Sequence, residues 1–305
     1  MVFARASLIL TNYFLPLNEA LCTFILFLTK VVDWMTICTA WIRKVANVEE
    51  LVFVTDSRLR SFGSWDCNPK IFTFSRTDCV MCFAGDTMFS YPMMIQLKNA
   101  VDANEKIRNR RQRLSVFKGV LIKILDGMLE HKSDYEIPDV EFLFGGYCWH
   151  EQKFKLWKII YQKNIKKFTQ HIVRWWQGVG SDIKVTFIGD YTDEARDLLI
   201  ENLKVKNKLK EGGLDFEPFE AIRDLLRDPD AQTKFPAIGG APQIIKVYKS
   251  LNHKAFALKW LYETNEKDQI IEKMTLLGMP IKTNINMFNP VMCADTTKVI
   301  KGNMY

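Results

Sequence analysis

The alternation of hydrophobic and polar positions predicts two pairs of strands at the start of the regular part of the chain. Residues 36–43 and 51–56 are short runs rich in β-forming residues, joined by a polar connection. Residues 70–75 and 79–84 repeat this arrangement across a short polar turn. Both pairs are typical of hairpins, so four strands are expected before any long helix.

Two helices are expected next. The second is the clearer one, because its apolar residues recur at helical spacing and form one stripe. These residues are Leu114, Phe117, Leu121, Ile124, Leu125 and Met128. The first helix covers roughly residues 88–104 and contains Pro92, which suits a first helical turn better than a helix middle.

The second half of the chain predicts the same alternation of strands and helices. The expected strands are residues 140–147, 153–161, 185–189, 243–248 and 255–261. One expected helix starts after Thr192, which can cap it, and another covers residues 218–227. Residues 162–183 are interpreted as an irregular connection, and the chain from residue 274 as one further strand. Runs of strands alternating with helix pairs indicate an α+β fold, with two sheets stacked between helical layers rather than one parallel βαβ sheet.

Length and charge narrow the class of protein. A chain of 305 residues can bury a large core, and its formal net charge of +7 is modest for this size. The densest basic stretch, residues 106–113, stands without a known nucleic-acid-binding module, so a solvated loop is the favoured interpretation. The chain contains no glycine-rich phosphate-binding motif after a predicted strand. We therefore expect no nucleic-acid partner and no cofactor.

The cysteine pattern bears on metals and on location. The seven cysteines are spread through apolar, strand-like surroundings. Cys79 and Cys82 have C-x-x-C spacing, but no second ligand pair completes a zinc site, so no metal is expected. Buried, reduced thiols in a cytoplasmic protein are the favoured interpretation.

The first 35 residues differ in pattern from the rest. The apolar stretch 21–29 is too short to span a bilayer, and the start lacks the basic and small-residue features of a secretory signal. Three interpretations stay open: a removed propeptide, an upstream start assigned in error, and a hydrophobic anchor, which is the least favoured. We divide the chain into a leader (1–35), a main domain (36–285) and a C-terminal tail (286–305), and we expect no membrane association.

Four short elements occur in order along the first strands. Thr36 heads the first strand, and Asp56 and Arg58 form an Asp-x-Arg element at the end of the second. Lys70 begins the third strand, and Gly85 belongs to an Ala-Gly element that opens the first helix. In order and spacing these elements resemble the amino-terminal half of proteasome β-subunits, and more closely that of their bacterial relatives HslV and Anbu. Hairpin loops absorb the small differences in spacing.

The resemblance implies an N-terminal-nucleophile (Ntn) hydrolase with a four-layer αββα sandwich. A threonine hydroxyl is a weak nucleophile near neutral pH, so the family uses the α-amine of the same residue, here Thr36, as the base. Lys70 is expected to add positive charge beside Thr36, and Asp56 to pair with Lys70. The N–H of Gly85 is expected to face the developing oxyanion, and Arg58 to support the site.

Each of these residues also has an ordinary structural interpretation. Thr36 can be a plain strand residue, and Asp56 can be a turn acceptor. Lys70 can be a surface lysine, and Gly85 can belong to a capping turn. Their occurrence together and in order favours the enzymatic interpretation.

The second half of the chain departs from the family pattern at two places. Asp190 stands where a site serine is expected. Asp228 and Asp230 lie near the position of a later site aspartate, but Gly239 and Gly240 follow without the expected serine. The resemblance therefore does not identify the residues that make these supporting contacts.

The implied chemistry needs a free amine on Thr36. Trp34 and Met35 precede it, whereas family propeptides usually end in glycine. This favours a true start at Met35 and removal of the methionine, because threonine is small enough for the aminopeptidase. A chain that keeps its leader is expected to be inactive.

We therefore expect a cytoplasmic threonine peptidase that acts on peptides or unfolded proteins. The resemblance implies a homo-oligomeric ring or stack, and leaves open whether an unfoldase partner exists. Two alternatives remain. One is a catalytically inactive scaffold subunit that uses its N-terminal extension to contact partners, and the other is an Ntn amidase acting on a small amide.

Overall fold

The computed structural model describes most of the chain after the predicted leader. The described residues are 36–60, 63–133, 137, 139–174, 184–209, 213–264, 270–281, 290–295 and 299–300. The chain divides into two compact units, residues 1–33 and 34–305, and every described element belongs to the second. The predicted leader, and with it the boundary at residue 35, lies outside the described residues.

A five-stranded antiparallel sheet contains the first hairpin. Its strands, in spatial order, are β10 (Val185–Gly189), β1 (Ile37–Val45), β2 (Val48–Thr55), β11 (Gln243–Tyr248) and β12 (His253–Ala255). The predicted hairpin is confirmed, but its polar connection is shorter than expected: only Ala46 and Asn47 form the turn, with Ala46 at φ 50°. Arg43 and Glu50 pair across the strands with an ion pair of 3.0 Å, which extends the ladder into residues expected to be a loop.

A second five-stranded antiparallel sheet follows the chain in order. Its strands are β5 (Ile71–Thr73), β6 (Cys79–Gly85), β7 (Val140–Cys148), β8 (Lys153–Gln162) and β9 (Lys167–Ile172). The prediction of an irregular connection over 162–183 is wrong where β9 pairs with β8. Phe168 is the one fully buried residue of β9, packed against Phe142 and Tyr161. A strand with one buried side chain shows no alternation of apolar and polar residues, so the sequence does not reveal it.

Two long helices and a short one come between β6 and β7. They are α2 (Thr87–Ala103), α3 (Glu105–Arg108) and α4 (Leu114–Leu129). The Asp86 carboxylate caps α2 by accepting from the N–H of Phe89 at 2.8 Å. Pro92 lies beyond the first turn of α2, which corrects its expected first-turn position. The predicted stripe of α4 is confirmed in part: Leu114, Phe117, Leu121 and Leu125 are buried, and Ile124 and Met128 pack against that core in part.

Three helices fall between β10 and β11. They are α5 (Thr192–Val205), α6 (Glu217–Arg227) and α7 (Ala231–Lys234). The expected cap by Thr192 is wrong: Tyr191 is the N-cap residue, in the left-handed region at φ 53°, and it makes no capping hydrogen bond with its side chain. The reason is the tight turn at Gly189, which leads directly into the helix.

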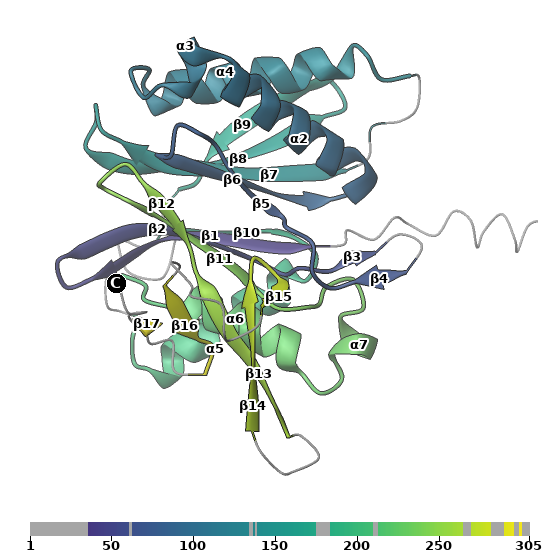
Figure 1. Ribbon diagram of the computed structural model, residues 1–305, viewed down its shortest axis with the longest axis vertical. Coiled ribbons are helices and arrows are strands. Elements are labelled where there is room, and N and C mark those ends of the chain that lie inside the picture. Colours follow the sequence, from purple (N-terminus) through teal and green to yellow (C-terminus); the bar gives the residue numbers. More distant parts are fainter. Residues whose placement is uncertain are drawn as a thin grey trace, which may run out of the picture. The chain divides into compact units, whose positions relative to one another are not determined.

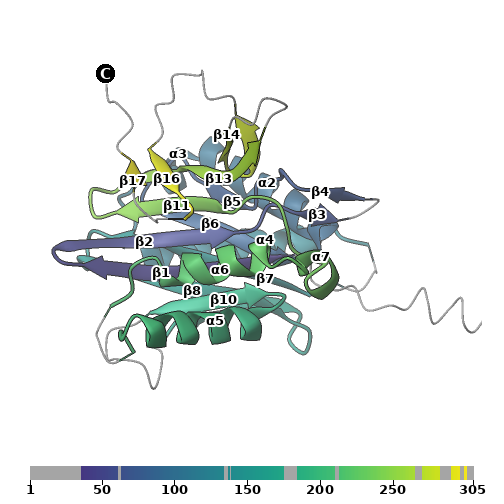
Figure 2. The ribbon, with the colours of Figure 1, turned by 90° about the horizontal axis from the view of Figure 1, so that it is seen from below.

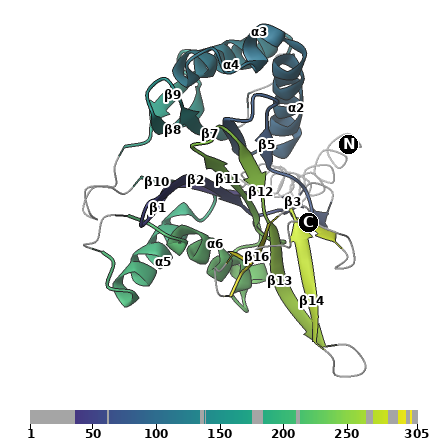
Figure 3. The same ribbon diagram turned by 60° about the vertical axis from the view of Figure 1, so that its left-hand side comes forward.

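The last part of the chain forms a third sheet. Its spatial order is β15 (Met279–Ile281), β14 (Ile270–Leu276), β13 (Ala257–Thr264), β16 (Val291–Cys293) and β17 (Val299–Ile300). Figure 3 shows β13 and β14 as its long hairpin. The strand predicted over 255–261 is divided at Phe256, so that β12 stays with β11 and β13 joins the third sheet. The expectation of a single strand after residue 274 is also wrong, since β15, β16 and β17 follow β14. Strands of two or three residues are too short to show a hydrophobic period in the sequence.

Alternate residues of one strand serve different cores. Ile37 and Trp41 of β1 pack with residues of α5 and α6, whereas Cys38 and Ala40 pack between the sheet of β1 and the sheet of β6. A third cluster, with Phe117 of α4, lies between the second sheet and α2 and α4. Figures 1 and 2 show the helices covering the outer faces of these two sheets. The result is a mixed α and β fold with several sheets.

Among the described residues, no helix combines the length and the apolar character needed to cross a bilayer. The six cysteines in the described part of the chain are free thiols.

Candidate active site

The ends of four strands bring the predicted site residues to one end of the two stacked sheets. Thr36 directly precedes β1, and Asp56 directly follows β2. Because these strands form one antiparallel hairpin, the end of β2 lies beside the start of β1, and the N–H of Asp56 donates to the carbonyl of Ile37 at 3.2 Å. Lys70 directly precedes β5, and Gly85 ends β6. All four predicted site residues are buried.

Asp56 is the centre of the polar network. Its Oδ1 accepts a hydrogen bond from Nζ of Lys70 at 2.8 Å and another from the N–H of Ile37 at 3.2 Å. Its Oδ2 accepts from the N–H groups of Arg58 and Gly239, each at 3.1 Å. Four donors therefore satisfy this buried carboxylate, which stabilises it in one orientation.

The Asp56–Lys70 pair lies fully out of solvent. Both side chains are 0% exposed. Burial raises the pKa of the Asp56 carboxyl, while the charge and hydrogen bond of Lys70 and the backbone donors of Gly239 and Ile37 oppose that shift. Charges are retained at such depth only when they are paired and hydrogen-bonded, and here the pair meets that condition.

Gln243 connects Lys70 to the neighbouring backbone. Its Oε1 accepts from the N–H of Lys70 at 3.0 Å. Its Nε2 donates to the carbonyls of Asn68 at 2.5 Å and Asp56 at 3.3 Å. Sequence reasoning missed this residue. The available signal was a glutamine at the head of the apolar strand β11, where an amide needs partners.

Gly85 occupies a position that only glycine fits. Its φ is 117°, and a Cβ there would collide with the carbonyl oxygen of Asp139 and come within 2.9 Å of Cα of Val140. The capped N-terminus of α2 begins two residues later. Backbone N–H groups and the positive end of the helix dipole at such a junction favour negative charge.

Asp190, which sequence reasoning treated as a departure, contacts Thr36. The nitrogen of Thr36 donates to Oδ2 of Asp190 at 3.3 Å, and the N–H of Asp190 donates to the carbonyl of Thr36 at 2.9 Å. The turn after β10 therefore meets the start of β1, in line with the pairing of Ile37 with Gly189. Only the tertiary pairing of β1 with β10 reveals this contact.

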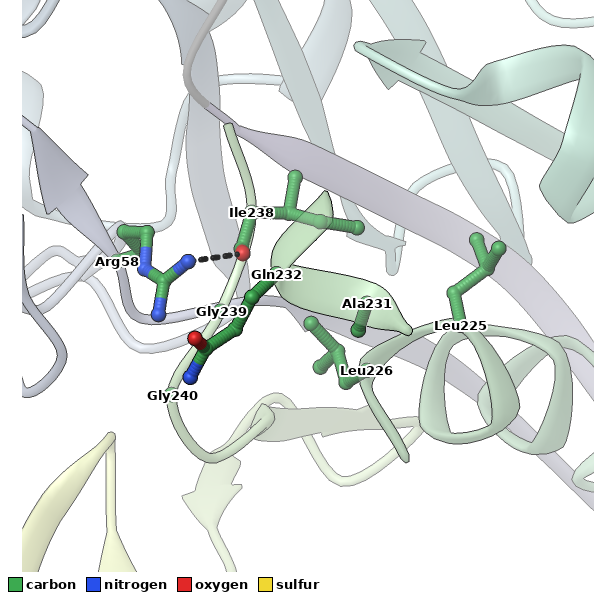
Figure 4. Close-up of a pocket in the computed structure, with 8 residues that line it drawn as sticks. All are labelled: Arg58, Leu225, Leu226, Ala231, Gln232, Ile238, Gly239 and Gly240. Atoms are coloured by element: carbon green, nitrogen blue, oxygen red, sulfur yellow. Dashed lines mark hydrogen bonds between the residues drawn. The ribbon is translucent and has the colours of Figure 1, made fainter. Parts of the chain in front are cut away.

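Arg58 lies to one side of the candidate site. Its guanidinium forms a two-bond ion pair with Asp66, at 2.7 and 2.8 Å, and donates to the carbonyl of Ile238 at 2.9 Å. Figure 4 shows this last bond at the edge of a small pocket. The pocket is lined by Arg58, Leu225, Leu226, Ala231, Gln232, Ile238, Gly239 and Gly240. Arg58 thus holds the segment whose Gly239 donates to Asp56.

Asp228 and Asp230 form ion pairs with Lys234, at 3.2 and 3.3 Å, on exposed parts of the chain around α7. Within the described part of the chain, both carboxylates bond to residues of their own segment and do not join the network of Asp56. Within the described ranges, no group of three or more His, Cys, Asp or Glu residues could hold a metal ion.

Comparison with known proteins gives a likeness of fold. No protein-family model matches the chain, and no curated protein matches it. Among solved structures, the chain is similar to Anbu (ancestral beta-subunit) from Yersinia bercovieri, with 14% identity, a TM-score of 0.50, and 72% of this chain and 86% of that chain covered.

Two further Anbu structures give the same result. The Anbu (Gly-1) mutant from Hyphomicrobium sp. strain MC1 has 11% identity and a TM-score of 0.50, over 72% of this chain and 86% of that chain. The helical assembly of the Anbu complex from Pseudomonas aeruginosa has 15% identity and a TM-score of 0.51, over 72% of this chain and 85% of that chain. The chain therefore has a proteasome-like fold similar to that of Anbu subunits, and at this identity the likeness concerns the fold alone.

Proposed function

We propose that this chain is a proteasome-like threonine peptidase with the four-layer αββα sandwich of Ntn hydrolases. Thr36 is its nucleophile once residues 1–35 are absent. One observation carries the proposal: Oδ1 of Asp56 accepts from both Nζ of the buried Lys70 and the N–H of Ile37, the residue next to Thr36. A fully buried lysine–carboxylate pair against the first residue of a strand matches the chemistry that an N-terminal nucleophile needs.

The reaction begins at the Thr36 hydroxyl. Its oxygen attacks the carbonyl carbon of the substrate peptide bond while the proton passes to the neutral α-amine of the same residue. The N–H of Gly85 faces the oxyanion that develops on the carbonyl oxygen. As the C–N bond breaks, the protonated amine returns a proton to the leaving nitrogen, and an ester to Thr36 remains. Water then attacks this ester and loses a proton to the amine; the acyl–oxygen bond breaks, the amine returns that proton to the oxygen of Thr36, and the acid product leaves.

The charge of Lys70 makes both partners of the first step more effective. Positive charge near the amine favours its neutral form, and positive charge near the hydroxyl favours ionisation of the oxygen. Asp56 holds Lys70 in place through their 2.8 Å hydrogen bond. Arg58 and Gly239 act indirectly, because their N–H groups fix Oδ2 of Asp56.

The mature enzyme needs a free nitrogen on Thr36. An amide nitrogen has no basic lone pair, so a chain that keeps its leader is inactive in this proposal. Removal of Met35 from a start at that residue, or removal of a propeptide, produces the same terminus. We further propose a cytoplasmic homo-oligomer that acts on peptides or unfolded proteins, which is supported by the fold likeness to a subunit of the Pseudomonas aeruginosa Anbu assembly.

The test compares chains with two different starts. Protein beginning at Thr36, released from a fusion, is expected to hydrolyse fluorogenic peptides and to gain the mass of a threonine-directed electrophile. The full-length chain is expected to do neither while its intact mass includes the leader. Thr36→Ala, with its terminus at residue 36, is expected to lose both activities.

Thr39→Ser is the matched control in the same strand. It keeps the hydroxyl that donates to the carbonyl of Thr186, and it is expected to retain hydrolysis and labelling. Hydrolysis or labelling that persists in Thr36→Ala would falsify the proposed nucleophile.

A second candidate function is an inactive scaffold subunit. Asp228 and Asp230 bond to Lys234 rather than to the network of Asp56, which favours this alternative. It predicts that protein purified from its native source carries Met1 and that a chain starting at Thr36 stays unreactive. Amino-terminal sequencing distinguishes the two functions.

A further inference from the structure

Asp190 holds both backbone polar groups of Thr36. Its Oδ2 accepts from the nitrogen of Thr36 at 3.3 Å, and its own N–H donates to the carbonyl of Thr36 at 2.9 Å. The two residues are 154 positions apart in the chain. The contact therefore depends on the pairing of β1 with β10 rather than on local sequence.

The turn around Asp190 is built for close approach to Thr36. Gly189 has a φ of 95°, and a Cβ there would collide with the carbonyl oxygen of Thr36 and lie 2.9 Å from Cβ of Ala84. Tyr191 has a φ of 53°, in the left-handed region that non-glycine residues rarely adopt. Packing of Tyr191 against Phe235, with ring centroids 4.9 Å apart, helps to hold this conformation. Such strain persists where the surrounding structure requires it, as it does at many functional sites.

The charges near the nitrogen of Thr36 come from three elements. Asp56 after β2 and Lys70 before β5 form one buried pair. Asp190 after β10 adds a second carboxylate, directly on the nitrogen. Tyr91 of α2 faces this pair: burial raises the pKa of its hydroxyl most, and the charges of Asp56 and Cys67 raise it further.

We propose that Asp190 is a positioning residue that binds the α-ammonium of mature Thr36 as an ion pair, and so sets the pH at which the amine becomes a base. This inference rests on the proposed function. A carboxylate at hydrogen-bond distance favours the protonated amine, whereas the nucleophile is activated only by the neutral amine. Asp190 therefore orients the amine and also moves the onset of activity to higher pH, against the effect of Lys70.

The experiment measures kcat/KM against pH for the chain that begins at Thr36, and for Asp190→Asn and Asp190→Ser. Both variants keep a short polar side chain, and at least one of them is expected to have a melting temperature close to that of wild type. The acid limb of the profile is expected to move to lower pH by about one unit, the lower end of the effect of a neighbouring opposite charge. Asp193→Asn, which removes an exposed carboxylate three residues further on, is the matched control and is expected to leave the limb in place.

A second measurement does not depend on activity. The ¹⁵N chemical shift of the terminal amine, in protein labelled on threonine, is followed against pH in the same variants. If the titration midpoint falls in Asp190→Asn or Asp190→Ser, the ion pair is supported even when peptide hydrolysis is absent. If a folded variant titrates as wild type does, Asp190 has no such role, although labelling of Thr36 can still support the peptidase. If wild type shows neither hydrolysis nor labelling, but the amine of an Asp190 variant titrates at lower pH than that of wild type, the peptidase is rejected and the ion pair is kept.

Discussion

Lys70 and Asp56 form an ion pair of 2.8 Å in which both side chains are fully withdrawn from solvent. Desolvation of two charges is expensive, so this pair contributes to stability only while both members and their hydrogen bonds are present. The N–H groups of Ile37 and Gly239 complete the shell of Asp56. The same arrangement that serves the proposed chemistry therefore also makes the site sensitive to substitution.

Loss of one member of this pair is expected to destabilise the protein strongly. Lys70→Met leaves Asp56 buried without its cation, at a cost of about 3–5 kcal/mol in the free energy of unfolding. The double variant Lys70→Met/Asp56→Leu is expected to recover much of this loss but no hydrolysis, which separates stability from chemistry. Urea denaturation and a peptide assay measure the two effects.

The control for that prediction is Arg196→Ala. Arg196 pairs with Asp193 at 2.6 Å on the surface, with side chains 46% and 82% exposed. Pairs of this kind are worth about 0–1 kcal/mol. A Lys70→Met variant no less stable than this control contradicts the buried pair.

Gly189→Ala tests the close approach of the β10 turn to Thr36. The added methyl meets the carbonyl oxygen of Thr36, and the φ of 95° is strained for alanine. A loss of about 1–3 kcal/mol is expected from thermal or urea unfolding. Gly119→Ala in α4 has nothing within 4 Å of the new methyl and is expected to stabilise by about 0.5–1 kcal/mol. Equal effects of the two substitutions contradict the geometry of the turn.

Arg58 is expected to act on the site through Gly239. Arg58→Lys cannot reproduce the two-bond pair with Asp66 together with the bond to the carbonyl of Ile238. The segment that carries Gly239 is then held less firmly, and kcat/KM is expected to fall on the order of tenfold to a hundredfold with the fold retained.

Arg60→Lys is the control, because the side chain of exposed Arg60 makes one hydrogen bond with the described residues, at 3.5 Å to the carbonyl of Pro236. Its hydrolysis is expected to match wild type. If kcat/KM of Arg58→Lys also matches that of wild type, Arg58 does not support the site.

Glu217 at the start of α6 is expected to make stability depend on acid pH. Burial acts to raise the pKa of Glu217, but hydrogen bonds from Lys208 at 2.7 Å and from the N–H of Asp215 at 2.6 Å outweigh it, so the pKa lies below its ordinary value of 4.5. The folded state thus binds fewer protons at this carboxyl than the unfolded chain does. The stabilisation is complete above pH 4.5 and is lost as the pH falls through the lower folded pKa.

Glu217→Gln is therefore expected to be less stable than wild type at pH 7, by about 1–3 kcal/mol. The difference narrows below pH 4.5, as measured by urea unfolding at a series of pH values. Glu201→Gln, at an exposed position of α5, is the control and is expected to show a constant, small difference. A gap for Glu217→Gln that is independent of pH contradicts the assignment.

The sequence by itself determined the early hairpins, the stripe of α4 and the order Thr36, Asp56, Lys70, Gly85. These are local or periodic features, and hydrophobic spacing and turn residues reveal them directly. Strands such as β9 and β16 were not predicted, because one or two buried residues do not form a hydrophobic period. Capping propensity predicts Thr192 as the N-cap of α5, but it gives no information on the strained turn at Gly189, which makes Tyr191 the N-cap.

Only the tertiary structure decided which residues surround Thr36. Asp190 meets its nitrogen because β10 pairs with β1, and Gln243 reaches Lys70 because β11 pairs with β2. Such contacts join residues more than 150 positions apart. No local pattern specifies them, since they depend on strand order and register, which are set by the burial of whole sheet faces in three cores.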